Sequence, residues 1–239
     1  MIRRVNRGVL EMISGSRNVL LGTLFLLVCC GPSDETGEGS LASDPEVAWR
    51  QLENRLLESR ELELDFDVRA QGAVEVDLKG AFSMDSVGTV KLHASGVFAG
   101  EEVDLRLASS GRSYEFGRAP DLTAGPTPGH LKEALLIGLT RMGILHNLAM
   151  LSAGAPPDRA DGGVKNWVTV DGFSTLPPGA PGKDGIGLGF SMTVDGAPVG
   201  TASLELDGNG LPVARRQVVL FPEGEMRVVE RYGSVKIHP

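Results

Sequence analysis

The segment from Leu131 to Leu151 constrains the fold of this 239-residue chain more than any other stretch. Its sequence, LKEALLIGLTRMGILHNLAML, is mostly apolar, and residues that stop a helix stand on both sides: Pro126, Pro128, Gly129, Gly154, Pro156 and Pro157. The segment is therefore predicted to form a helix of about twenty residues. Arg141 and His146 inside it argue against a membrane span.

Apolar residues cover more than one face of this predicted helix. At about 100° per residue, one apolar stripe is formed by Leu131, Ala134, Leu135, Gly138, Met142, Leu145 and Ala149. A narrow polar line of Glu133, Thr140 and Asn147 is crowded by further apolar residues: Leu136, Ile137, Ile144, Leu148 and Leu151. One sheet face cannot cover so much apolar surface, so the second face is either covered by a loop or strand or lines a ligand cavity. Gly138 and Gly143 could also divide the segment into two shorter helices.

On both sides of this segment the hydrophobic period changes to two, which is typical of strands with one dry and one wet face. The alternating stretches before it are 61–69, 74–79, 87–96, 102–107 and 113–116. Those after it are 164–170, 186–194, 202–206, 214–220 and 225–232. Glycine-containing turns between neighbours predict consecutive antiparallel hairpins.

A further helix is predicted before the first strand, because Asp44 is a good N-cap and Pro45 suits the first helical position. Together the elements predict an α+β fold. Its centre would be a strongly curved antiparallel sheet, a half-open β-barrel of about ten strands, with the central apolar helix on its concave side and the N-terminal helix beside it.

The N-terminal residues predict export and a lipid anchor. A start with four arginines precedes the uncharged run 19–28, VLLGTLFLLV, which is too short to cross a bilayer as a helix but fits a signal peptide. Residues 27–31, LVCCG, at the end of this run resemble the lipobox of bacterial lipoproteins. The resemblance implies acylation of Cys30, with Cys29 as second choice, and a plain secretory cleavage is the alternative.

The predicted division of the chain follows from that signal. Residues 1–29 would be the lipoprotein signal peptide, 30–43 the lipidated Cys and a flexible Gly/Ser-rich tether, and 44–239 a single domain.

Charge and cysteine content exclude several classes of function. The full chain carries 23 Lys+Arg and 31 Asp+Glu, a net charge of −8, and loss of 1–29 removes four arginines and Glu11, which leaves −11. Such acidity argues against nucleic acid and anionic headgroups as partners, so the predicted membrane contact is through N-terminal acyl chains. Cys29 and Cys30 are the only cysteines, so the predicted domain has no disulfide and no thiolate metal site.

No constellation of side chains predicts catalysis, a metal or a cofactor. The histidines His93, His130, His146 and His238 are scattered, and none has metal-ligand spacing. A Gly-x-Ser-x-Gly elbow is missing from the sequence, and the stretch 207–210, DGNG, is a turn without the later ligands of a calcium loop. We therefore predict a non-enzyme without metal or cofactor.

The order of these features resembles the LolA/LolB superfamily of bacterial lipoprotein carriers and receptors and its LppX/LprG-like lipoprotein relatives. The resemblance spans roughly residue 44 to the end and rests on element order, not on a diagnostic motif. It implies a half-open barrel whose apolar lining holds acyl chains. Ligand contacts are expected from apolar residues of the sheet and the helix: Leu64, Phe66, Val76, Leu105, Leu136, Leu139, Met142, Ile144, Leu188 and Phe190.

Two functions follow as hypotheses. The favoured one is a membrane-anchored envelope lipoprotein that binds a lipid or a lipoprotein acyl chain in an apolar cavity. The alternative is a non-enzymatic interaction, sensor or assembly lipoprotein with the same fold and a filled core, which would bind an envelope protein partner. Gly31 is not acidic, which by analogy with lipoprotein sorting in some Gram-negative bacteria favours the outer membrane, facing the periplasm, over the inner membrane.

Overall fold

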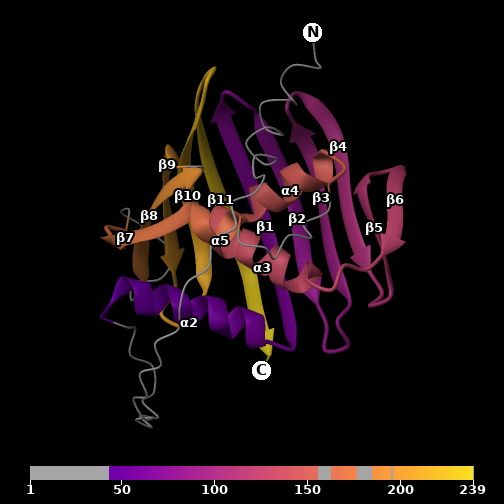
Figure 1. The fold of residues 1–239 in the computed structure, drawn as a ribbon, viewed down its shortest axis with the longest axis horizontal. Helices are drawn as coiled ribbons and strands as arrows, with labels where there is room; N and C mark the ends of the chain where they lie inside the picture. Colours follow the sequence, from indigo (N-terminus) through magenta and orange to yellow (C-terminus); the bar gives the residue numbers. More distant parts are fainter. Residues whose placement is uncertain (1–42, 156–162, 177–184, 195, 239) are drawn as a thin grey trace, which may run out of the picture.

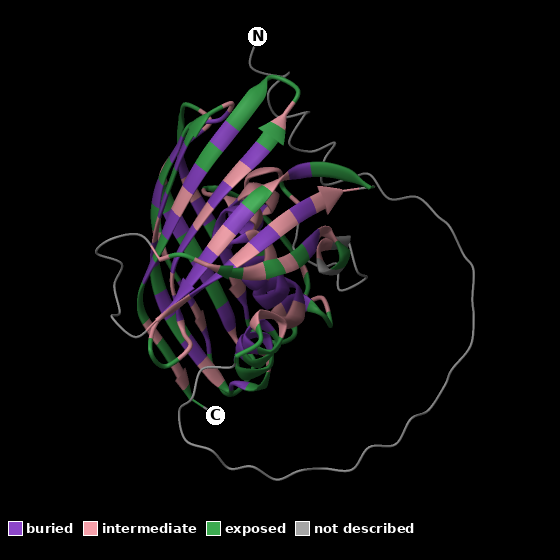
Figure 2. Ribbon diagram, turned by 90° about the vertical axis from the view of Figure 1, so that its left-hand side faces the viewer, coloured by how far each residue is buried: buried purple, intermediate pink, exposed green. Residues whose placement is uncertain are grey.

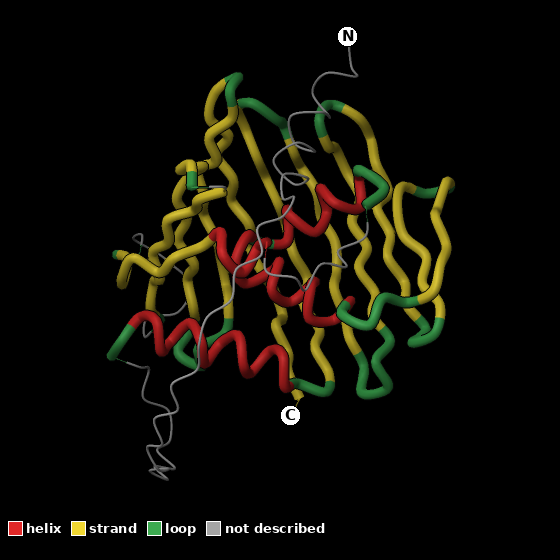
Figure 3. The backbone as a smooth tube through the Cα atoms, viewed as in Figure 1, coloured by secondary structure: helices red, strands yellow, loops and turns green. Residues whose placement is uncertain are grey.

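The computed structural model describes residues 43–155, 163–176, 185–194 and 196–238. Its centre is one eleven-stranded antiparallel sheet that curves around the helices and stays open between its edge strands, β6 (Asp121–Pro126) and β7 (Val168–Ser174) (Figure 1). The helices lie across the concave side of the sheet (Figure 3). The predicted α+β fold with a curved, half-open sheet is confirmed.

The strands are two runs of hairpins joined in the middle. The first run contains β1 (Glu61–Gly72), β2 (Val76–Met84), β3 (Val90–Phe98), β4 (Glu101–Ser109), β5 (Ser113–Arg118) and β6. The second contains β7, β8 (Ile186–Val194), β9 (Ala197–Leu206), β10 (Pro212–Phe221) and β11 (Gly224–His238). The spatial order is β6-β5-β4-β3-β2-β1-β11-β10-β9-β8-β7, so the pairing of β1 with β11 unites the runs.

Alternation of apolar and polar residues places one face of each long strand in the core, as the stripes in Figure 2 show. In β1, Leu62, Leu64 and Phe66 are buried, while Glu63 and Asp65 between them are exposed. The pattern therefore determines which face of the sheet meets the helices.

Two elements differ from the sequence-based prediction. Strand β6, sequence DLTAGP, has no apolar alternation to mark it, and it forms because it pairs along β5. The stretch predicted as a strand from Val164 begins instead with the short helix α5 (Gly163–Trp167), and β7 starts only at Val168. Trp167 packs edge-on against His146 at 6.1 Å between ring centroids, a contact that sequence periodicity cannot show.

The N-terminal helix α2 (Pro45–Glu58) begins as predicted. The Asp44 side chain accepts hydrogen bonds from the backbone N–H groups of Glu46 (2.8 Å) and Val47 (3.1 Å), and Pro45 occupies the first turn. The buried face of α2 includes Trp49, whose ring meets Phe190 of β8 edge-on at 5.2 Å. The helix thus closes one end of the concave side.

The apolar segment folds as two helices, which is the alternative that its two glycines left open. Helix α3 (Leu131–Met142) and helix α4 (Ile144–Ser152) are separated by Gly143, at φ 85° and ψ 168°. Gly138 remains inside α3, where its missing Cβ leaves room for the Asn147 side chain of α4. The Asn147 amide donates to the carbonyl of Leu135 at 2.9 Å, so the two helices pack closely side by side.

The core is continuous from α2 through the sheet to α4, and its buried residues lie between Ala48 and Tyr232. Residues 43–239 therefore carry the complete core that the structure describes. Among the described residues, no helix is both long and apolar enough to span a membrane.

Candidate functional site

A buried polar junction holds α4 in place at its N-terminal end. The Glu230 carboxylate of β11 accepts hydrogen bonds from the backbone N–H groups of Ile144 (2.9 Å) and Leu145 (3.0 Å), and Tyr232 donates its hydroxyl to the same carboxylate. The first N–H groups of a helix have no carbonyl partner within the helix, and the carboxylate supplies one. Its negative charge also interacts favourably with the helix dipole. Gly143 permits the contact, because a Cβ there would lie 2.5 Å and 2.6 Å from the two Glu230 oxygens.

The same junction caps the C-terminal end of α3. Arg215 of β10, the cross-strand neighbour of Glu230, donates to the carbonyls of Thr140 (3.2 Å) and Arg141 (2.5 Å). Its Nε donates to the side-chain oxygen of Gln217 at 3.0 Å. Both Arg215 and Glu230 are fully buried, so each needs these partners.

Burial sets the titration of this junction. It raises the pKa of the Glu230 carboxyl, against the opposing effect of the Tyr232 hydrogen bond and the Arg215 charge. Burial also lowers the pKa of Arg215 and raises that of Tyr232 well above its usual value. The Tyr232 hydroxyl therefore stays a hydrogen-bond donor at neutral pH.

A second polar contact fixes α4 at its other end. Arg118 of β5 donates to the backbone carbonyl (3.3 Å) and the hydroxyl (2.7 Å) of Ser152, the last residue of α4. Since Glu230 and Arg118 lie on distant strands, α4 is held across the curved sheet from β11 to β5.

Helix α3 is fixed to α2 by a separate ion pair. The Glu53 carboxylate of α2 accepts hydrogen bonds from Arg141 (both 2.8 Å) and from the Thr140 hydroxyl (2.9 Å). The Arg141 guanidinium also lies 4.5 Å above the Trp49 ring. The polar line predicted on this segment is thus largely sheltered, because Thr140 and Asn147 are both buried.

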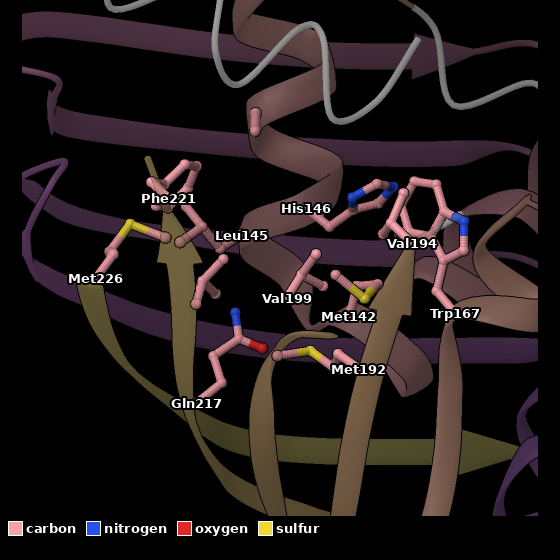
Figure 4. A pocket seen from close by; sticks show the side chains of 12 residues that line it. Met142, Leu145, His146, Trp167, Met192, Val194, Val199, Gln217, Phe221 and Met226 are labelled. Atoms are coloured by element: carbon pink, nitrogen blue, oxygen red, sulfur yellow. The ribbon is translucent and has the colours of Figure 1, made fainter. Parts of the chain in front are cut away.

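An apolar pocket of about 90 Å³ lies beside α4, at the ends of β8 to β11 (Figure 4). Its floor is buried and its rim is half-buried. The floor is formed by Leu145, Met192, Val199, Gln217, Val219 and Met226, and the rim by Met142, His146, Ala149, Trp167, Val194 and Phe221. Apart from His146 and Gln217, these twelve side chains are aliphatic, thioether or aromatic, so the pocket offers an apolar ligand a matching surface.

His146 does not bring charge to this pocket at neutral pH. Burial lowers its pKa to about 4, because no acidic partner offsets the desolvation of the imidazolium. The neutral ring instead packs at 90° to the Trp167 ring, and both form one side of the rim.

Three thioethers make the pocket adaptable. They belong to Met142 of α3, Met192 of β8 and Met226 of β11. Unbranched methionine side chains change rotamer easily and fit varied apolar shapes. The pocket can therefore widen without movement of the strands.

The residues predicted from the sequence lie mostly elsewhere. Only Met142 lines the pocket, and the other nine are buried in the core away from it: Leu64, Phe66, Val76, Leu105, Leu136, Leu139, Ile144, Leu188 and Phe190.

Sequence reasoning missed the pocket residues of β9 to β11. A usable signal was present in β10, where Arg215 and Gln217 share a strand face with Val219. Polar residues on an inward face indicate a site where the core is not simply apolar. Within the described residues, no group of three or more His, Cys, Asp and Glu side chains is arranged to hold a metal ion.

Comparison with known proteins finds likeness in structure only. Neither a family model nor a curated protein matches the sequence. The fold is similar to LprF from Mycobacterium bovis (11% identity, 80% of this chain and 92% of the other, TM-score 0.37) and to a LolA superfamily protein from Nitrosomonas europaea (8%, 83% and 95%, TM-score 0.35). It is also similar to MucB (13%, 82% of this chain and 60% of the other, TM-score 0.40). Overlaps of this size leave the function to be argued from the pocket.

Proposed function

We propose that this chain is a non-enzymatic envelope lipoprotein that binds the end of a lipid or of a lipoprotein acyl chain in the pocket between α4 and the ends of β8 to β11. The observation that supports it is the lining: apolar side chains from seven elements meet around one space, and His146 is uncharged there. Water held against such walls has few partners, so an apolar group displaces it readily.

The size of the pocket limits what it holds. Ligand pockets for drug-sized molecules measure about 300–1,000 Å³, and a cavity of about 150 Å³ accepts benzene. A pocket of about 90 Å³ therefore accommodates a chain end, and the remainder of a long chain would follow past the half-buried rim. Each buried methylene contributes about 0.8 kcal/mol, so a few methylenes give a weak but useful affinity.

Anchoring is the second part of the proposal. The signal peptide 1–29, the acylated Cys30 (or Cys29) and the tether 30–43 fall almost wholly outside the described residues and remain predictions from the sequence. On this proposal the domain 44–239 is held at the membrane by its acyl chains, at the outer membrane facing the periplasm in preference to the inner membrane.

A second candidate function is favoured by one observation. Nine of the ten predicted ligand contacts are buried in the core and do not line the pocket, as expected for an interaction or assembly lipoprotein whose interior is filled. Such a protein would bind an envelope protein partner through its surface, and the pocket would be a packing defect.

Native mass spectrometry of the full chain extracted from its own membrane separates the two functions. Lipid binding predicts a mass increment beyond the N-terminal acyl chains, and the increment is lost in Ala149→Phe, which fills the rim of the pocket. Val87→Phe is the control, because Val87 is 80% exposed and lies away from the pocket. A wild-type chain that carries only its covalent lipids would support the filled-core function instead.

A further inference from the structure

The floor of the pocket contains one polar side chain in a defined orientation. Gln217 is 94% buried, since only 6% of its surface is exposed. Its Oε1 accepts the Nε–H of Arg215 at 3.0 Å. A guanidinium can only donate, so the oxygen of the amide must face Arg215 and the –NH₂ group must face away from it.

The –NH₂ group of Gln217 points into the pocket. Figure 4 shows the side chain rising from β10 with its nitrogen toward Leu145. The other floor residues are Leu145, Met192, Val199, Val219 and Met226, whose side chains offer no oxygen acceptor. Within the part of the chain that the structure describes, Gln217 Nε2 has no hydrogen-bond acceptor.

Nε2 is not one of the fully buried unpaired polar atoms among the described residues, so water from the pocket can bond to it when no ligand is present. A ligand that displaces this water must offer an acceptor in its place or lose the hydrogen bond. A ligand oxygen that reaches the floor would satisfy the donor and leave the rest of the ligand among apolar walls.

We infer that the pocket selects an uncharged apolar ligand whose leading end carries a carbonyl-type oxygen, and that Gln217 Nε2 donates a hydrogen bond to this oxygen. This inference rests on the proposed function and narrows its ligand class to esters, ketones or amides with an apolar body. A plain hydrocarbon end would displace water from the donor without replacing its hydrogen bond, so it should bind more weakly than an end that carries a carbonyl oxygen. A carboxylate would meet no free positive charge, because Arg215 is already bonded to Gln217 and to the carbonyls of Thr140 and Arg141.

The test compares two probes of nearly equal shape, acetophenone and α-methylstyrene, which differ in a carbonyl oxygen against a methylene. Only the small acetyl or isopropenyl end has to enter the pocket of about 90 Å³, and the phenyl ring would remain against the half-buried rim. Their dissociation constants are measured by calorimetry with residues 43–239, and their ratio is compared between wild type and variants. This comparison cancels the different hydration of the two probes. Benzoate serves as the charged probe of similar size.

The informative variant is Gln217→Glu. Its carboxylate still accepts from Arg215, so the packing is retained, but an acceptor replaces the donor in the pocket. We expect the affinity for acetophenone relative to α-methylstyrene to fall about tenfold, since one hydrogen bond is lost and a repulsive oxygen pair replaces it. Gln217→Met removes the donor without adding charge and should lower the ratio about fivefold. Met192→Leu changes the floor but not the donor, and the ratio should stay within about twofold.

A second readout needs no variant to fold. In the wild-type chain with ¹⁵N-labelled glutamine, acetophenone should shift the Gln217 side-chain –NH₂ resonances further than α-methylstyrene does. The outcomes separate the two proposals. If both probes bind but the ratio is the same in all variants, or if benzoate binds more tightly than acetophenone, the ligand class is wrong and the apolar pocket stands. If neither probe binds, the proposed function itself fails.

Discussion

Replacement of Gly143 by alanine probes the junction that positions α4. The residue has φ 85° and ψ 168°, a conformation that is nearly restricted to glycine and costs other residues about 1–3 kcal/mol. The new Cβ would also lie 2.5 Å and 2.6 Å from the Glu230 oxygens, so the carboxylate has to move.

That movement breaks the hydrogen bonds from the Ile144 and Leu145 backbone N–H groups to Glu230. Hydrogen bonds to a charged group contribute about 1.5–3 kcal/mol, so together with the backbone strain the variant should lose about 3–5 kcal/mol. A loss of this size is a large part of the total stability of a domain, about 5–15 kcal/mol.

Urea unfolding of residues 43–239, followed by circular dichroism, measures this loss. The control is Gly154→Ala, because Gly154 also has a positive φ (69°) but no atom lies within 4 Å of the added Cβ. The control should lose about 1–2 kcal/mol through backbone strain alone. Variants that differ by less than about 1 kcal/mol would refute the claim that the Gly143–Glu230 contact holds the two helices.

Two further predictions concern His146 and Glu53. Burial lowers the pKa of His146 to about 4, so the unfolded chain binds its proton first and stability should fall as the pH drops from 6.5 toward 4. Because the side chain is partly exposed, we expect the free energy of unfolding to fall by only about 1–2 kcal/mol between pH 7 and pH 4.5. The variant His146→Leu should lack this loss. The same pH dependence in both proteins would contradict the assignment. Glu53→Ala removes the buried carboxylate that pairs with Arg141 and should destabilise by about 3 kcal/mol. The control Glu46→Ala removes an exposed ion pair to Arg50 and should cost only about 0.5 kcal/mol in the same urea titration. Equal losses of stability in Glu53→Ala and Glu46→Ala would show that the α2–α3 contact is not important.

The elements were predictable where local pattern decides them. Alternation in β1 and its neighbours shows directly which residues face inward, and the pair Asp44-Pro45 marks the start of α2 without tertiary information. The break at Gly143 could be suspected but not chosen over Gly138, because the choice depends on a carboxylate from β11, remote in sequence.

The pocket was less predictable, because inward apolar residues look alike whether they fill a core or line a space. Phe190 and Met192 follow the same alternation in β8, yet only Met192 reaches the pocket, since α2 covers Phe190 with Trp49. The position of the helices decides the difference, and it depends on buried polar contacts such as that of Arg215. A charged residue at an inward strand position, such as Arg215 in β10, is the sequence signal that marks such a contact.

The central claim is that an apolar ligand enters the pocket beside α4, and methionine methyl NMR tests it most directly. Residues 43–239 labelled with ¹³C at the methionine methyls would be titrated with methyl laurate. The account predicts shifts for Met142, Met192 and Met226, which line the pocket, and none for Met84, which is 4% exposed in the core at the end of β2. Saturable shifts centred on Met84, or no shifts at all, would contradict it.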